Sequence, residues 1–183
     1  MNETLGSARA TYYQVNGFGD DGGDALEWVP LKIWKLTLKI PNTDGRRRAV
    51  RLHDLHHVLT GYATDLAGES EIAAWELASG CRRMPAAFVL NLFALAIGIL
   101  IAPVRLARAW ARGRHTQNLY TEDGVDHLLP REVTEVRARL RLDAPAPQVR
   151  LRDVAAMTLS ALPPLAVMAA PVAGLALLVR AFI

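Results

Sequence analysis

The stretch LHDLHHVLTGYATDLAGESEI, residues 52–72, carries the strongest structural signal in this sequence. Two glycines, Gly61 and Gly68, interrupt it and separate two segments that favour helix. We expect a first helix over residues 52–59 and a second over residues 69–80, which closes with a glycine as many helices do. A protein organised around this pair of helices is predicted to be mainly α-helical.

The same stretch gathers side chains that can bind metals. His53 and His57 are four residues apart, so they stack on one face of a helix and suit a single ion. Asp54 lies about 100° round the helix from His53 and could bind the ion or orient a ligand. Glu69 would come from the second helix, so a metal would tie the two helices together. His56 points away from this face, and we expect it to pack in the interior or to support a ligand.

Each of these residues also has an ordinary structural explanation. A histidine pair on a helix is more often solvated or packed than bound to a metal. Glu69 and Glu71 could simply stabilise the first turn of their own helix by interacting with its dipole. The acidic residues next to and downstream of the histidine pair favour the metal interpretation.

The spacing of the metal-capable residues resembles a known family motif. The pattern His53-Asp54-x-x-His57-x11-Glu69 is similar, without gaps, to the signature of the ubiquinone (coenzyme Q) biosynthesis family known as the fourth Coq protein. The surrounding TGYATDLAGE, residues 60–69, belongs to the same likeness. The resemblance implies that the four motif residues bind one divalent metal, usually taken as Zn²⁺, and that Asp54 and Glu69 act in catalysis.

The likeness extends more loosely over residues 25–142. It implies a mostly helical, membrane-associated protein that handles polyprenylated quinone precursors. It also implies work on ring carbon C1, where a carboxyl group is lost and a hydroxyl group replaces it. This work would take place within or beside a complex of other quinone-biosynthesis proteins.

Composition supports contact with a membrane. Apolar residues make up 51% of the chain although 21% is charged, so the apolar residues must be clustered. Residues 85–104 and 154–179 contain no charge, and each segment is long enough to cross a bilayer. The net charge is only +3, and arginines flank the apolar segments, which suits lipid headgroups better than nucleic acid. The single cysteine, Cys81, rules out an internal disulfide.

The chain divides into three expected parts. Residues 1–25 are polar and glycine-rich and read as a mobile arm. Residues 26–142 form the metal-binding helical domain, and residues 143–183 form a linker with prolines and a hydrophobic membrane tail. A small β-hairpin is expected ahead of the metal helix, with strands over residues 36–40 and 46–52.

The two apolar segments allow more than one arrangement. The helix over residues 85–104 could be buried, lining a groove for an isoprenoid tail, or could span the bilayer, and a basic amphipathic extension follows it. The tail could be a single anchor or a re-entrant hairpin that turns at Pro163 and Pro164.

Four functions fit parts of this pattern. The first is a metal-dependent quinone-pathway protein that uses Zn²⁺, Fe²⁺ or another divalent ion. The second is a non-catalytic lipid-binding scaffold of a quinone-biosynthesis complex. The third is a membrane metallohydrolase, which is disfavoured because Asp54 is one methylene shorter than the glutamate of H-E-x-x-H enzymes. The fourth, a di-iron lipid desaturase or hydroxylase, needs more histidines than the five present.

The expected location follows from the same features. An early Glu3 and the polar residues around it argue against a secretory signal. The arginine- and alanine-rich composition suggests a bacterial protein on the cytoplasmic face of the inner membrane. The expected partners are a polyprenylated quinone precursor, membrane lipid, other quinone-biosynthesis proteins and a second copy of the chain.

Overall fold

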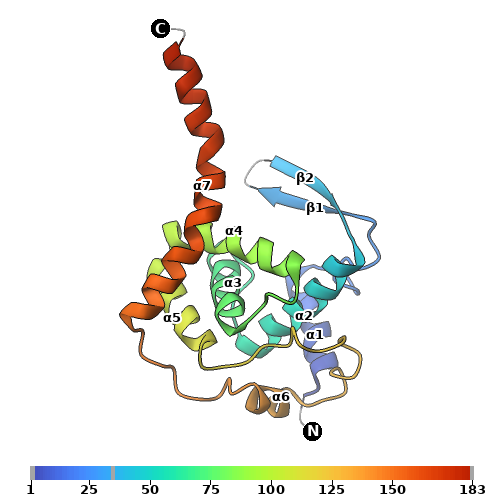
Figure 1. Cartoon of the computed structure of the whole chain (residues 1–183). Helices are drawn as coiled ribbons and strands as arrows, with labels where there is room; N and C mark the ends of the chain where they lie inside the picture. The colour runs from blue at the N-terminus through green and yellow to red at the C-terminus, as the bar shows by residue number, and fades with distance from the viewer. Residues whose placement is uncertain (1–2, 34–35, 182–183) are drawn as a thin grey trace.

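A computed structural model describes residues 3–33 and 36–181 (Figure 1). The fold over these residues is mainly helical, as predicted, with seven helices and one antiparallel hairpin. The elements are α1 (Leu5–Asn16), β1 (Trp28–Ile33), β2 (Leu36–Pro41), α2 (Asp44–Thr60), α3 (Leu66–Ser79), α4 (Pro85–Ile101), α5 (Pro103–Gly113), α6 (Val133–Arg139) and α7 (Leu151–Ala181).

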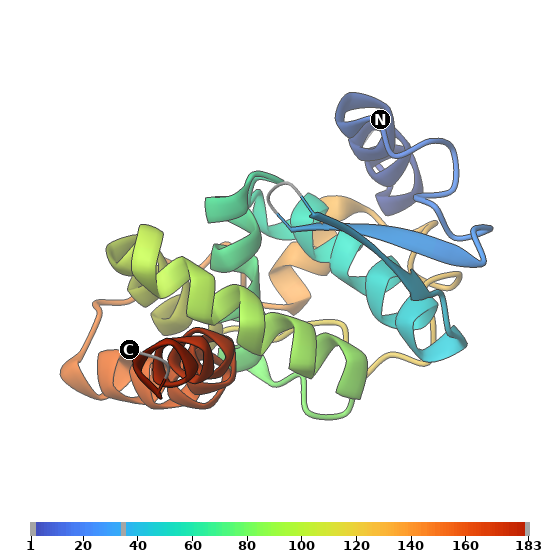
Figure 2. The same ribbon diagram turned by 90° about the horizontal axis from the view of Figure 1, so that it is seen from above.

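Helix α3 lies at the centre of the molecule. It packs against α4 and α5, and α7 runs across both of these helices before it leaves the body of the protein. Figure 2 shows α4 between two projecting elements, with α7 on one side and the hairpin over α2 on the other. The core is formed by the apolar side chains that these helices turn inward.

The hairpin is present, but one of its expected strands is wrong. The strand expected over residues 36–40 is β2, and its partner is β1, with Trp28 opposite Pro41. Residues 46–52, expected as the second strand, belong to α2. The reason is local: the Thr43 side chain accepts a hydrogen bond from the backbone N–H of Arg46 and starts a helix where we expected a turn.

The segment 1–25, for which we expected a mobile arm, contains a helix. Leu5 and Tyr13 of α1 are buried, and the helix packs against α2. Its start is fixed to a distant loop, because the N–H of Leu5 donates to the carbonyl oxygen of Arg131 at 2.8 Å. Gly17 ends the helix with a φ of 68°. The boundaries expected at residues 25 and 142 stay predictions.

Two glycines let the central helices approach closely. A Cβ at Gly98 of α4 would lie 2.3 Å from the Cβ of Ser70, and a Cβ at Gly113 of α5 would lie 2.4 Å from the carbonyl oxygen of Trp75. Both contacts are too short for any larger residue without movement. Glycine therefore brings α4 and α5 onto α3, the helix that carries Glu69.

The first apolar helix is shorter than expected. It begins at Pro85, as predicted, but α4 ends at Ile101, before Pro103 starts α5. Proline disfavours helical geometry at the residue before it, which explains the break at Ala102. Helix α5 is the amphipathic extension that we expected, with Leu106 buried.

The C-terminal tail is one continuous helix, so the re-entrant hairpin is wrong. Helix α7 passes through Pro163 and Pro164 without turning back. Its first turns pack through Met157 and Ala161 against the core. The window Leu151–Pro171 has a mean hydropathy of 1.6 and is mostly exposed. By length and composition it could cross or anchor in a membrane.

Candidate metal centre

Three of the predicted ligands converge between α2 and α3. The Nε2 atoms of His53 and His57 lie 3.1 Å apart, and each lies 3.4 Å from an oxygen of Glu69. The side chain of His57 is 1% exposed, whereas those of His53 and Glu69 are 22% and 40% exposed. The group therefore has a closed back and one open side. It could hold a metal ion.

The spacing of these atoms suits zinc. Ligand atoms about 2.0–2.1 Å from a tetrahedral ion lie about 3.3 Å from one another. The three separations in the group, 3.1, 3.4 and 3.4 Å, are close to this value. Glu69 presents a different oxygen to each histidine, so a modest rotation of its carboxylate would bring one oxygen to a shared ion. A fourth position would then remain on the open side.

Hydrogen bonds fix both imidazole rings in the form that binds metal. The Nδ1 of His57 lies 2.9 Å from the carbonyl oxygen of Tyr62, and the Nδ1 of His53 lies 2.8 Å from Oε1 of Glu76. Both oxygens are acceptors, so both Nδ1 atoms carry hydrogen and donate. The two Nε2 lone pairs then face each other, and a proton or a metal must lie between them. This arrangement is typical of metal-binding histidines.

Glu76 organises the polar interior behind the group. It is fully buried and accepts hydrogen bonds from His53, His56, Asn91 and Tyr120. Burial would raise the pKa of Glu76, but the charge and the hydrogen bond of His53 outweigh it, and the pKa lies well below its usual range. The carboxylate is therefore ionised and can only accept.

Sequence reasoning missed Glu76, although a signal was present. Glu76 follows Glu69 by seven residues, which places both carboxylates on one face of α3, two turns apart. The same spacing gives each carboxylate one ring nitrogen of His53. A buried glutamate among apolar neighbours needs several donors, and this requirement points to a polar cluster.

His56 is fully buried and contacts the same oxygen of Glu76 as His53 does. Its Nδ1 donates to Oε1 of Glu76 at 2.6 Å, and its Nε2 accepts from the backbone N–H of Leu119 at 2.9 Å. The ring packs edge-to-face with Trp75 and Tyr120. Burial lowers the pKa of His56, so the ring is neutral. His56 thus packs in the interior and shares Glu76 with His53.

Asp54, the fourth predicted ligand, lies outside the three-residue group. Its Oδ2 accepts a hydrogen bond from the hydroxyl of Tyr13 at 2.8 Å. Burial raises the pKa of Asp54, and burial together with Asp54 raises that of Tyr13. Tyr12, the neighbouring residue, stacks on His57 with ring centroids 5.6 Å apart. Both tyrosines come from α1, the segment expected to be an arm, which is why sequence reasoning did not connect them with the site.

A cavity of about 620 Å³ adjoins the metal group. His53, Asp54 and Glu69 line one part of it. Most of the remaining wall is apolar and comes largely from α4, including Leu90, Phe93, Ala94 and Ile97. The cavity therefore places a possible metal at the polar end of an apolar chamber, a combination that suits a ligand with a polar head and a hydrocarbon tail.

Comparison with known proteins gives no further guide: no protein-family model, curated protein or solved structure matches the chain. Over the residues that the structure describes, the fold and the site define a mainly helical protein with a possible metal group and one apolar helix of membrane-spanning length.

Proposed function

We propose that this chain is a metal-dependent protein of prenylquinone biosynthesis that acts at a membrane on a polyprenylated ring precursor. The observation that carries the proposal is the position of the His53, His57 and Glu69 group in and beside the wall of an apolar cavity. The motif that contains these residues resembles the signature of a ubiquinone-biosynthesis family. The resemblance indicates the reaction, and the apolar cavity offers a place for the polyprenyl tail of the precursor.

Two imidazoles and one carboxylate suit Zn²⁺ as a Lewis acid, and Fe²⁺ accepts the same ligand set. The chain itself fixes the rings through Glu76 and the carbonyl oxygen of Tyr62. It also excludes water from the back of the group, where His57 is buried under the ring of Tyr12. These residues would hold the polar head of a ligand in one orientation.

The cavity fits the two ends of the proposed substrate. Leu90, Phe93 and Ile97 would contact the isoprenoid tail. The carboxylated ring would lie at the end formed by Glu69 and Asp54. Asp54, whose pKa burial raises, can exchange a proton with the ring from the cavity wall.

The proposed reaction is the exchange of the C1 carboxyl group for a hydroxyl group. An aromatic acid and water give the phenol and CO₂, together with two protons and two electrons. The electrons need an acceptor, and oxygen or a partner protein must provide it. Asp54 would take up a proton, and Glu69 would remain a ligand. In the metal-free protein the neighbouring histidines outweigh the burial of Glu69 and lower its pKa to about 2, so the carboxylate is already ionised when a cation binds.

The elements around the cavity support attachment to a membrane. Helix α4 exposes Val89, Leu100 and Ile101, and α7 projects from the same side of the molecule as the hairpin (Figure 1). With this side on the bilayer, the cavity beside α4 lies next to the lipid phase. A lipid substrate would then enter without crossing water. We propose the cytoplasmic face of a bacterial inner membrane as the site of attachment.

A scaffold role is the second candidate. The metal group joins α2 to α3, so an ion there could serve only to staple the two helices. The protein would then bind the lipid and recruit other quinone-biosynthesis proteins. A hydrolase is less favoured, because Asp54 is hydrogen-bonded to Tyr13 and lies outside the three-residue group.

The test is a mass-spectrometric profile of quinone lipids in cells that lack the protein. We expect a prenylated, still-carboxylated precursor to accumulate. Wild type and the control Glu71→Ala, on the same helix, should correct the profile, and Glu69→Ala should not. An unchanged profile in the deletion strain would contradict the proposal.

The two candidate functions differ in what Glu69→Ala does to the purified protein. A catalytic site predicts loss of the C1 step while fold and partners are kept. A scaffold predicts that the partners are lost together with the metal.

A further inference from the structure

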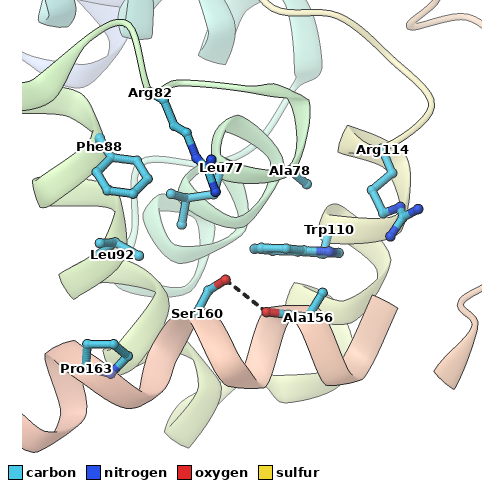
Figure 3. Close-up of a pocket in the computed structure, with 10 residues that line it drawn as sticks. All are labelled: Leu77, Ala78, Arg82, Phe88, Leu92, Trp110, Arg114, Ala156, Ser160 and Pro163. Carbon is cyan, nitrogen blue, oxygen red and sulfur yellow. Dashed lines mark hydrogen bonds between the residues drawn. The ribbon is translucent and has the colours of Figure 1, made fainter. Parts of the chain in front are cut away.

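A second cavity, of about 650 Å³, lies between α3, α4, α5 and α7 (Figure 3). It shares no lining residue with the cavity at the metal group. Its walls combine apolar side chains with two arginines. The inference that follows concerns this site alone and does not depend on the metal.

The cavity carries an excess of positive charge. Arg82 approaches it from the turn between α3 and α4 and Arg114 from the turn after α5, and Figure 3 shows them on separate sides. Arg114 is partly neutralised, because its Nε lies 3.3 Å from Oδ1 of the buried Asp153. Arg82 forms no ion pair with a carboxylate of the described residues. One guanidinium is thus available to an anion.

A buried donor in the wall also lacks an acceptor. The indole Nε1–H of Trp110 is buried and has no hydrogen-bond partner within the described part of the chain. Leaving a buried N–H without an acceptor is costly, so a ligand oxygen that reached this N–H from the cavity would be stabilised. Ser160 does not offer its proton, because its hydroxyl already donates to the carbonyl oxygen of Ala156 at 2.9 Å (Figure 3).

The other half of the cavity is apolar and leads toward the exposed part of α7. Phe88 and Leu92 of α4 and Pro163 of α7 line it. Leu159 and Leu162, on the same turns of α7, are exposed. A ligand that satisfies both halves has an anionic head and a hydrocarbon body, which describes an anionic phospholipid.

We propose that this cavity binds the headgroup of one anionic phospholipid, with its phosphate near Arg82 and the Trp110 indole. The acyl chains would follow the apolar surfaces of α4 and α7 into the bilayer. A bound lipid would fix the base of α7 at the membrane surface. Basic residues beside an apolar helix recognise anionic lipids in this way.

The test uses the full chain, purified in detergent and titrated with phosphatidylglycerol or phosphatidylcholine under native mass spectrometry. We expect one phosphatidylglycerol per chain and much weaker binding of phosphatidylcholine. Arg82→Gln should weaken binding about fivefold, the change expected when one arginine near the lipid surface is lost. Arg83→Gln is the matched control, because Arg83 is adjacent and exposed but does not line the cavity.

Trp110→Phe tests the indole donor separately, since it keeps the aromatic ring and removes the N–H. We expect it to weaken phosphatidylglycerol binding while the chain stays folded by circular dichroism. Equal losses in Arg82→Gln and Arg83→Gln would overturn the proposal, because they would show general attraction only. Equal binding of phosphatidylcholine would also overturn it. Displacement of the lipid by millimolar inorganic phosphate would assign a free anion in place of a phospholipid.

Discussion

Glu69 and Glu76 lie two turns apart on α3 and hold the two ring nitrogens of His53 between them. Oε2 of Glu69 lies 3.4 Å from Nε2, and Oε1 of Glu76 lies 2.8 Å from Nδ1. One carboxylate is partly exposed at the metal group, and the other is fully buried behind it. The helix thus supplies both a candidate ligand and the residue that orients the neighbouring ligand.

Glu76→Gln should weaken metal binding without removing a ligand. The amide keeps the shape of the side chain but loses the charge that holds the Nδ1–H of His53. Loss of such a partner typically costs about tenfold to a hundredfold in metal affinity. Competition with a chromophoric zinc chelator would measure the change. The control is Glu71→Gln, on the same helix, because Glu71 pairs with Arg105 and should not affect zinc binding. Equal zinc affinity of Glu76→Gln and Glu71→Gln would argue against the role of Glu76.

Zinc affinity should rise with pH. Burial would lower the pKa of His53, but Glu76 and Glu69 outweigh it, and the pKa lies well above 6.5. In the metal-free protein, protonated His53 therefore contributes stability that is fully present below about pH 6.5 and is lost as pH rises through its folded-state pKa. Zinc must displace this proton, so affinity should increase about tenfold per pH unit below that pKa.

The same chelator competition between about pH 6 and pH 8, corrected for the chelator's own protonation, would measure this slope. His115→Ala is the control, because His115 is exposed and does not belong to the group. It should keep the wild-type slope. A pH-independent affinity in wild type would show that no proton is exchanged at the site.

Gly98→Ala should destabilise the protein. The added methyl group would meet Ser70 at 2.3 Å and Leu106 at 2.7 Å, so α4 would have to move away from α3. Overpacking of this kind costs about 1–3 kcal/mol in the free energy of unfolding. Gly45→Ala, in the first turn of α2, meets nothing within 4 Å and should be neutral or slightly stabilising. Denaturant unfolding would measure the free energy of unfolding of both variants. If Gly98→Ala were as stable as wild type, α4 and α3 would not be in close contact at this position.

Truncation after Leu165 should release the protein from strong membrane attachment. The turns of α7 up to Leu165 pack on the core, whereas residues 166–181 would extend about 24 Å at the helical rise, most of the thickness of the hydrocarbon layer. Carbonate extraction of cell membranes would measure the attachment. The full chain should stay with the membrane and the truncated chain should be extracted. Retention of both would place the attachment in α4 or the hairpin.

The sequence predicts where the two helices of the motif end, because glycine signals are local, but α2 begins at Asp44, eight residues before the expected start. Gly61 and Gly80 end α2 and α3 with left-handed φ values of 76° and 106°, as expected of glycine after a helix. The second strand of the hairpin was expected after β2, but its partner β1 precedes it. Thr43 begins helix α2 there, although the residues around it also favour a turn. Pattern alone does not decide between these outcomes.

The candidate site depends more on contacts that sequence spacing cannot show. His53, His57 and Glu69 were found because a short motif holds them on two adjacent helices. Tyr13 meets Asp54 across 41 residues of sequence, and Tyr120 meets Glu76 across 44. Such pairs are set by tertiary packing, so a single sequence gives no direct sign of them.

The most direct test of the metal centre is the zinc content of the purified chain, together with the X-ray absorption spectrum of the bound ion. We predict one ion per chain in wild type and in His115→Ala, with nitrogen and oxygen ligands at about 2.0–2.1 Å. We predict almost none in His57→Ala, with helix content unchanged by circular dichroism. Two results would contradict a metal centre at these residues. One is a wild-type chain that holds no divalent ion after zinc loading, and the other is a His57→Ala variant that holds as much zinc as wild type.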